Sequence, residues 1–203
     1  MVLKPDGVAI VLGAGRVGLR KAKALSAAGF AVKLVDRRKP SALPRGAGFK
    51  RVNISEENLA TVLRGASLIV SALNDRPLNS AVSRQCRRAG IPVNVVDDPE
   101  LCTFTMPAVA ARGSLVIAIS TSGLAPFLSA TLRKELEPLV ARRAPLVAIV
   151  AEIRQRVPGR AVLGQVFRDG RFRRAVDSGR WKTARSLALQ IASKARHAGR
   201  RGG

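Results

Sequence analysis

The sequence predicts an α/β protein with a mostly parallel sheet, followed by a small second unit and a helical carboxyl-terminal region. Segments typical of strands and of helices alternate four times within the first 96 residues, which favours right-handed crossovers between parallel strands. Only 3% of the residues are aromatic while 47% are hydrophobic, so the core must be aliphatic. A chain of 203 residues also exceeds the common size of one domain, roughly 100–150 residues.

The first strand and helix are predicted most clearly. Residues 8–12 form an unbroken aliphatic run, typical of a strand buried on both faces. Apolar residues then recur at helical spacing over residues 16–28, and Gly29 is placed to end that helix. We expect a second strand over residues 31–35 that ends at Asp36.

The same alternation continues to residue 96. We expect strands over residues 49–54, 67–73 and 92–96, a helix over 56–64 with Ser55 as its N-cap, and a helix from the turn 74–77 to Gly90. Beyond Pro107 the pattern changes to a strand over 114–119, a turn over 120–123, a helix over 125–140 that ends near Pro138, and helical segments over 145–156 and 181–197 joined by an Arg-rich link. The expected domains are therefore 1–110, 111–144 and 145–203. Trp181 is expected to anchor a helix in a small core.

A glycine-rich turn joins the first strand to the first helix. Gly13, Gly15 and Gly18, with Arg16 and Val17 between them, form G-x-G-x-x-G in the strand-turn-helix context that binds dinucleotides. The first glycine allows the tight turn, the second lets a pyrophosphate approach the backbone, and the third lets helix and strand pack closely. The helix N-terminus adds N–H groups and a positive dipole end. The pattern predicts an NAD-binding Rossmann domain.

Asp36, at the end of the second strand, is the candidate ligand of the ribose. A carboxylate there accepts hydrogen bonds from the 2′-hydroxyl and repels a 2′-phosphate, which favours NAD over NADP. Arg37 and Arg38 follow directly and could contact a 2′-phosphate or stack on the adenine. A solvated turn residue is the alternative reading of Asp36.

Asp97 is the candidate catalytic group. It follows Asn94-Val95-Val96 at the carboxyl end of a predicted strand, the edge at which open α/β sheets bind ligands. On position alone an aspartate there is also typical of a structural cap.

Four sequence pieces extend this interpretation. They are Gly13-Ala14-Gly15-Arg16-Val17 with Arg20-Lys21-Ala22, Asn74-Asp75 with Asn79, Asn94-Val95-Val96-Asp97 leading through Phe104 to Pro107, and Ser120-Thr121-Ser122-Gly123 leading through Ala125-Pro126 to Leu132. With these pieces, residues 8–136 resemble the precorrin-2 dehydrogenase and sirohydrochlorin ferrochelatase family of siroheme biosynthesis. The region beyond Val140 matches no motif of that family.

The resemblance implies NAD-dependent oxidation of precorrin-2 to sirohydrochlorin by a cytoplasmic homodimer. It implies that Asp97 acts as base in the oxidation and in a second activity, insertion of Fe²⁺ as a substrate, without a dedicated metal site. Asn94 and the loop of Ser120, Thr121, Ser122 and Gly123 are implied to bind the anionic tetrapyrrole, the loop as an anion nest. A plain turn is the alternative reading of that loop.

The charge of the chain fits this substrate and leaves one alternative open. Lys and Arg number 36 against 13 Asp and Glu, a net charge of +23 that attracts polyanions. The alternative is an NAD-sensing regulatory module whose basic carboxyl-terminal half binds a polyanionic partner. Nucleic acid is not the expected partner, and no apolar run has the length of a membrane span, roughly 18 residues. Cys86 and Cys102 are expected as reduced thiols, and His197 is not expected to bind a ligand.

Overall fold

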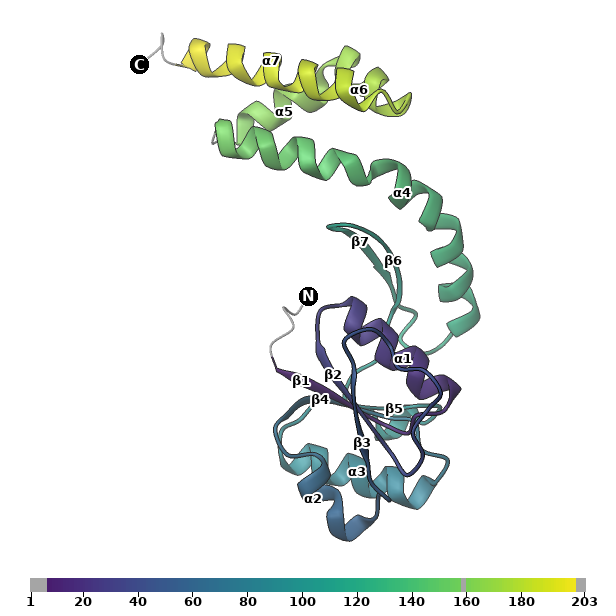
Figure 1. Cartoon of the computed structure of the whole chain (residues 1–203). Helices are drawn as coiled ribbons and strands as arrows, with labels where there is room; N and C mark the ends of the chain where they lie inside the picture. Colours follow the sequence, from purple (N-terminus) through teal and green to yellow (C-terminus); the bar gives the residue numbers. More distant parts are fainter. Residues whose placement is uncertain (1–6, 158–159, 200–203) are drawn as a thin grey trace. The chain divides into compact units, whose positions relative to one another are not determined.

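The chain divides into two compact units, Met1–Met106 and Pro107–Gly203, which are described separately. The computed structural model describes residues 7–157 and 160–199. Figure 1 shows an α/β unit followed by a hairpin and helices. The α/β class is confirmed, while the predicted boundaries at residues 110 and 144 stay predictions.

The first unit is built on a five-stranded parallel sheet in the order β3-β2-β1-β4-β5. The strands are β1 (Val8–Leu12), β2 (Ala31–Asp36), β3 (Gly48–Arg51), β4 (Ala66–Ser71) and β5 (Val93–Val95). The order runs outward in one direction from β1 to β3 and in the other direction from β1 through β4 to β5. Ligands of open parallel sheets bind beyond the carboxyl ends of the strands at such a reversal, here between β1 and β4.

Helices cover both faces of this sheet (Figure 1): α1 (Arg16–Ala27) one face, α2 (Leu59–Val62) and α3 (Arg76–Arg88) the other. Alternate residues of β1 explain the two layers. Ile10 and Leu12 belong to the core cluster under α2 and α3, and Ala9 and Val11 to the cluster under α1. Both faces of the central strands are therefore buried, as the unbroken aliphatic runs predict.

The helix predicted over residues 56–64 is shorter than expected. It consists of a 3₁₀ turn, Glu56–Asn58, followed by the single turn of α2. The Ser55 N–H donates to Oδ1 of Asn58 at 3.1 Å, which orders the start of this segment. Gly65, with φ +74°, ends it before β4.

The second unit opens with an antiparallel hairpin of β6 (Ala108–Arg112) and β7 (Leu115–Ile119). Only the second of these strands is predicted from the sequence. Strand β6 reads Ala-Val-Ala-Ala-Arg, and alanine has low strand propensity, so its pairing with β7 rather than its composition defines it.

The expectation that a helix ends near Pro138 is wrong. Helix α4 runs unbroken from Pro126 to Arg156 with Pro138 and Pro145 inside it, and it curves in Figure 1. Each proline removes one backbone donor, which bends a helix without ending it when the flanking turns are held by packing. Here α4 packs on both strands of the hairpin and on α7.

The expectation of only an Arg-rich link between residues 156 and 181 is also wrong. This segment contains α5 (Arg160–Arg168) and α6 (Gly170–Asp177), followed by α7 (Trp181–Gly199). Arginine has good helix propensity, and Phe172, Ala175 and Val176 place a buried stripe at helical spacing. Trp181 packs against the resulting core, as expected.

Candidate functional site

A cavity of about 560 Å³ lies at the carboxyl edge of the parallel sheet. The glycine-rich turn forms one wall, and the residues after β4, from Ala72 to Asp75, form another. The predicted residues that line it are Gly13, Gly15, Arg16, Val17, Gly18, Asp36 and Arg37. The exposed Arg38 side chain is not part of this lining.

The three glycines differ in what surrounds them. Gly13 has φ +91°, and a Cβ there would lie 2.6 Å from the Ala72 carbonyl oxygen. A Cβ on Gly18 would lie 1.9 Å from the Gly13 carbonyl oxygen, so helix and turn meet at this position. No atom lies within 4 Å of a Cβ built on Gly15, among the described residues, and this glycine is exposed. The geometry therefore leaves open space where a pyrophosphate would approach the backbone.

The start of α1 presents backbone donors to the same cavity. The first intrahelical hydrogen bond is donated by Leu19 N–H to the Gly15 carbonyl at 2.9 Å, so the N–H groups of Arg16, Val17 and Gly18 precede the helical ladder. The first turn carries no acidic side chain. With the helix dipole, these groups suit an anionic ligand.

Asp36 is joined to the glycine-rich turn. Its Oδ2 accepts a hydrogen bond from the Ala14 N–H at 2.7 Å, and its Oδ1 accepts one from the Arg38 N–H at 3.0 Å. An ionised carboxylate has about four lone-pair positions, so two remain for a ligand hydroxyl. The residues thus fit a dinucleotide: open space and free donors for phosphate, and a fixed acceptor for ribose.

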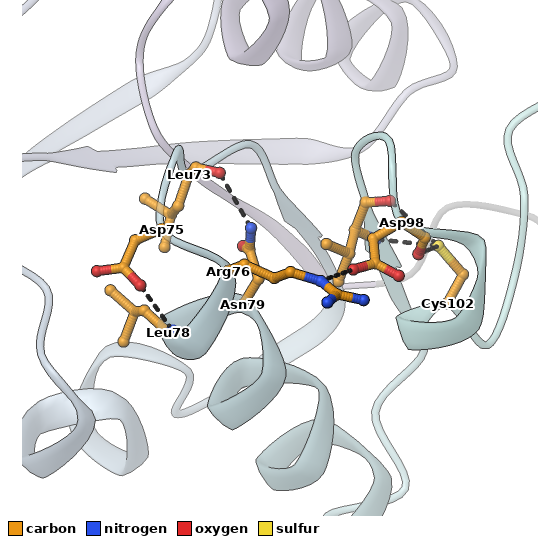
Figure 2. A network of polar contacts seen from close by, with 8 residues as sticks. Leu73, Asp75, Arg76, Leu78, Asn79, Asp98 and Cys102 are labelled. Carbon is orange, nitrogen blue, oxygen red and sulfur yellow. Dashed lines mark hydrogen bonds and ion pairs between the residues drawn. The ribbon is translucent and has the colours of Figure 1, made fainter.

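The wall formed by residues 72–75 is held by hydrogen bonds, drawn in part in Figure 2. The Asn79 amide donates to the Leu73 carbonyl at 3.0 Å and accepts from the Ser71 hydroxyl at 2.6 Å. Asp75 caps α3 by accepting from the Leu78 N–H at 2.9 Å. Both ends of this wall are therefore fixed, at β4 and at α3.

Asp97 lies at the carboxyl end of the neighbouring strand β5, in an exposed turn and in the left-handed conformation with φ +60°. It is not part of the cavity lining. Asn94, within strand β5, is only 7% exposed, and its side-chain amide donates to the Phe104 carbonyl at 3.1 Å. Its Oδ1 has no hydrogen-bond partner among the described residues. The assigned roles of Asp97 and Asn94 stay predictions.

Lys21 is a charged group that the prediction of site residues missed. It is half-buried on α1, three residues after Gly18. Burial lowers the pKa of Lys21 and Arg20 lowers it further, while the nearby Cys102 and Asp97 raise it. An amine in this position adds positive charge to the surroundings of the Asp97 carboxylate. Its helical spacing from Gly18 is the sequence signal that could have indicated it.

The loop of Ser120 to Gly123 belongs to the second unit and joins β7 to α4. The Thr121 hydroxyl accepts from the Ala125 N–H at 3.1 Å and contacts the Ser129 hydroxyl at 3.2 Å, so it organises the start of α4. Ser122 and Gly123 are exposed in the left-handed region, with φ +53° and +83°. The two residues lie in a turn, and successive backbone N–H groups of a turn can form a concavity that binds anions. The anion nest stays a prediction.

Two further findings concern the described parts of the chain. In residues 7–157 and 160–199 no group of three or more His, Cys, Asp or Glu side chains lies close enough to hold a metal ion. No helix in the same residues is long and apolar enough to cross a membrane. The side chain of His197 lies outside the described residues.

Family models match two adjacent segments of the chain. Residues 5–108 match a model described as "Putative NAD(P)-binding", and residues 112–138 match one described as "Sirohaem biosynthesis protein central". The first segment is the sheet unit with its nucleotide cavity. The second covers the end of the hairpin, the Ser120 loop and the start of α4.

Curated relatives and a solved structure agree with these matches. The chain is 35% identical over 201 residues to a siroheme synthase of Methylobacillus flagellatus, covering 93% of this chain and 42% of that protein. It is 37% identical over 153 residues to a siroheme synthase of Methylococcus capsulatus, covering 73% of this chain and 32% of that protein. The chain thus spans less than half the length of these relatives.

The solved structure of SirC, described as a precorrin-2 dehydrogenase, has the same fold with a TM-score of 0.69. The match covers 94% of this chain and 96% of that one at 21% identity. Since the NAD(P)-binding model alone covers half of the residues, the chain belongs to that NAD(P)-binding family, with the central segment of sirohaem biosynthesis proteins following it in the sequence.

Proposed function

We propose that this chain is an NAD-dependent precorrin-2 dehydrogenase that oxidises precorrin-2 to sirohydrochlorin. The observation that carries the proposal is the placement of two features at one sheet edge. The dinucleotide cavity opens beyond β1 and β4, and Asp97 follows β5, the next strand. The names of the relatives and of SirC supply the substrate class.

The dinucleotide would be held by the glycine-rich turn, the N-terminus of α1 and Asp36. When bound, the nicotinamide supplies the hydride acceptor of the oxidation. We propose NAD rather than NADP because both Asp36 oxygens are already fixed by backbone N–H groups, so the charge stays where a 2′-phosphate would lie. Arg37 also lines the cavity and could stack on the adenine.

Asp97 would be the base of the reaction. Oxidation of the macrocycle releases one hydride and one proton, and the exposed carboxylate at the end of β5 can accept the proton. Ionised, it also stabilises positive charge that develops on the ring as the hydride leaves.

The tetrapyrrole carboxylates would be held by backbone donors and hydroxyls of Ser120, Thr121, Ser122 and Gly123. The exposure of Ser122 and Gly123 in a turn supports this assignment. We include Asn94 in the substrate side of the site because it lies three residues before Asp97 and its buried side-chain Oδ1 has no hydrogen-bond partner among the described residues. A net charge of +23 favours a polyanionic substrate.

A homodimer is part of the proposal. Large apolar side chains are exposed in the second unit, with Leu124 at 90%, Phe127 at 85%, Val116 at 51% and Val109 at 44%. Clustered exposed apolar residues mark interaction surfaces. We place the protein in the cytoplasm, where NAD is available and the free thiols of Cys86 and Cys102 would stay reduced.

The test is incubation of the purified protein with precorrin-2 and either NAD or NADP. We expect sirohydrochlorin and NADH in equal amounts, faster with NAD. Adding Fe²⁺ to sirohydrochlorin tests insertion of the metal as a second activity, which should exceed the spontaneous rate. Absence of oxidation, together with polyanion binding that weakens steeply as salt rises, would instead favour the regulatory module.

A further inference from the structure

The turn that carries Asp97 is held from both of its sides, which the proposed catalytic role does not by itself require. Residues with a side chain seldom adopt a left-handed conformation, and they persist in it where the surroundings fix it. Asp97 has φ +60°. Its own carboxylate takes part in no hydrogen bond or ion pair found among the described residues, so its neighbours must fix the turn.

The Cys102 thiol spans the turn. Its sulfur accepts from the Val95 N–H at 3.2 Å and lies 3.2 Å from the Val95 carbonyl and 3.3 Å from the Asp98 carbonyl. The Asn94 amide also donates to it, at 3.4 Å. A thiol has one proton and a sulfur that accepts weakly, so it can donate to one of these carbonyls while accepting the two N–H groups. One side chain thereby joins the residues before and after Asp97.

The Asp98 carboxylate joins the turn to the wall of the nucleotide cavity. Its Oδ2 pairs with Nε of Arg76 at 3.1 Å, as Figure 2 shows, and its side chain is only 16% exposed. Arg76 is the first residue of α3 and directly follows Asp75, which lines the cavity. The pair thus connects the β5 turn with the loop that would lie against the dinucleotide.

Because the Arg76 side chain is exposed, an effect of its ion pair on the reaction rate can be distinguished from an effect on stability. Its side chain is 78% exposed, and exposed ion pairs contribute little to the free energy of unfolding. A purely structural pair at this location would therefore matter for neither stability nor rate. A positioning pair would matter for rate alone.

We propose that Cys102 and the Arg76–Asp98 ion pair are positioning residues that hold Asp97 in register with the nucleotide cavity. The proposal rests on the proposed function, since Asp97 is taken as the base. Loss of either contact lets the turn relax, and displacement of a reacting group by about 1 Å can lower a rate by up to about a hundredfold.

The experiment compares Arg76→Ala, Asp98→Asn, their double variant and Cys102→Ala with the native chain. We expect kcat for precorrin-2 oxidation to fall about tenfold in each, with the KM for NAD nearly unchanged. The Tm should stay nearly unchanged in Arg76→Ala, whose side chain is exposed, and should fall in Cys102→Ala, which removes the acceptor of the Val95 N–H. The double variant should be no slower than either single variant, because both remove one contact. Cys102→Ser, which keeps a donor and an acceptor, should restore part of the rate.

Arg84→Ala is the matched control. Arg84 lies on the same helix, and its ion pair at 3.1 Å is with Glu56 in the 3₁₀ turn before α2, not with a residue of the Asp97 turn. Its removal should leave kcat unchanged. If kcat fell as much as in Arg76→Ala, loss of any surface ion pair on this helix would lower the rate, and the proposal would be overturned.

Amide hydrogen exchange of residues 94–102 tests the same contacts without any substrate. Exchange should accelerate in Cys102→Ala and Asp98→Asn and not in Arg84→Ala. Unchanged exchange, or faster exchange with unchanged kcat, would overturn the proposal. A native chain that does not oxidise precorrin-2 would contradict the proposed function, and with it the assignment of Asp97, while the exchange data would report separately whether these residues hold the turn.

Discussion

Oδ2 of Asp36 lies 2.7 Å from the backbone nitrogen of Ala14, so the acid at the end of β2 accepts a hydrogen bond from the glycine-rich turn after β1. The proposed ribose-binding and phosphate-binding parts of the cavity are thus joined directly. A carboxylate fixed in this way selects between cofactors by its charge as well as by its hydrogen bonds.

Asp36→Asn should therefore change cofactor preference more than stability. The asparagine carbonyl can still accept from the Ala14 N–H, while the negative charge is lost. We expect kcat/KM for NAD to fall about tenfold and that for NADP to rise, because hydrogen bonds to charged groups contribute about 1.5–3 kcal/mol. Steady-state kinetics with both cofactors measure this. An unchanged ratio would show that Asp36 does not contact the ribose.

Alanine at two positions of the glycine-rich turn should have different effects. In Gly18→Ala the new methyl meets the Gly13 carbonyl oxygen at 1.9 Å, so the backbone must shift. We expect a loss of about 2–3 kcal/mol in the free energy of unfolding, typical of overpacking. Urea titration measures it. A Gly18→Ala chain as stable as the native one would contradict the close packing of α1 on the turn.

Gly15→Ala should fold normally, because a Cβ there meets no atom within 4 Å among the described residues. We expect NAD to bind about tenfold more weakly, since the methyl occupies the space where the pyrophosphate approaches the backbone. Calorimetric titration gives the Kd, and the Tm serves as its control. Native affinity would place the pyrophosphate elsewhere.

The sequence predicts the first unit well because its signals are local. The aliphatic run at residues 8–12, the glycines and Asp36 all lie within the first strand-turn-helix-strand segment, and the glycines and Asp36 line the cavity. The contacts around Asp97 are different. Arg76 and Asp98 are 22 positions apart, and only the pairing of β4 with β5 brings their loops together.

The second unit is harder to predict because tertiary packing overrides local preference. Pro138 and Pro145 are strong helix-ending signals, yet α4 continues through both while packing on the hairpin and α7. Strand β6 is composed mainly of alanine and is defined by its partner. Local composition therefore predicts neither the continuation of α4 through its prolines nor the pairing of β6 with β7.

Cys86 gives a pH dependence of stability. It is fully buried in the core under α3, and burial raises the pKa of its thiol from 9.0 to about 11. The unfolded chain would ionise this thiol first, so the free energy of unfolding should decrease as the pH rises from 9 to 11. The chain has no tyrosine that would titrate in the same range.

Urea titrations at pH 8 and pH 10.5 measure this decrease. Cys86→Ala should be less stable at pH 8 and show a smaller decrease, because the titrating thiol is gone. An equal decrease in both chains would show that Cys86 is not its source.

Phe127→Asp should convert the proposed dimer to monomers. The side chain is 85% exposed at the start of α4, so a charge there should hardly change the stability of the monomer. The same charge should strongly destabilise an apolar interface between two copies. Light scattering after size exclusion gives the mass. Phe127→Leu, which keeps the apolar surface, is the control and should remain dimeric. A native chain that is monomeric at micromolar concentration would contradict the dimer.

The central claim is that Asp97 is the base in oxidation of precorrin-2, and single-turnover oxidation by Asp97→Asn with saturating NAD tests it most directly. Asparagine retains the size of the side chain and cannot accept the proton. We expect native NAD affinity and Tm, with a rate lower by about a hundredfold or more, the usual contribution of a general base. A variant that forms sirohydrochlorin at the native rate would contradict it.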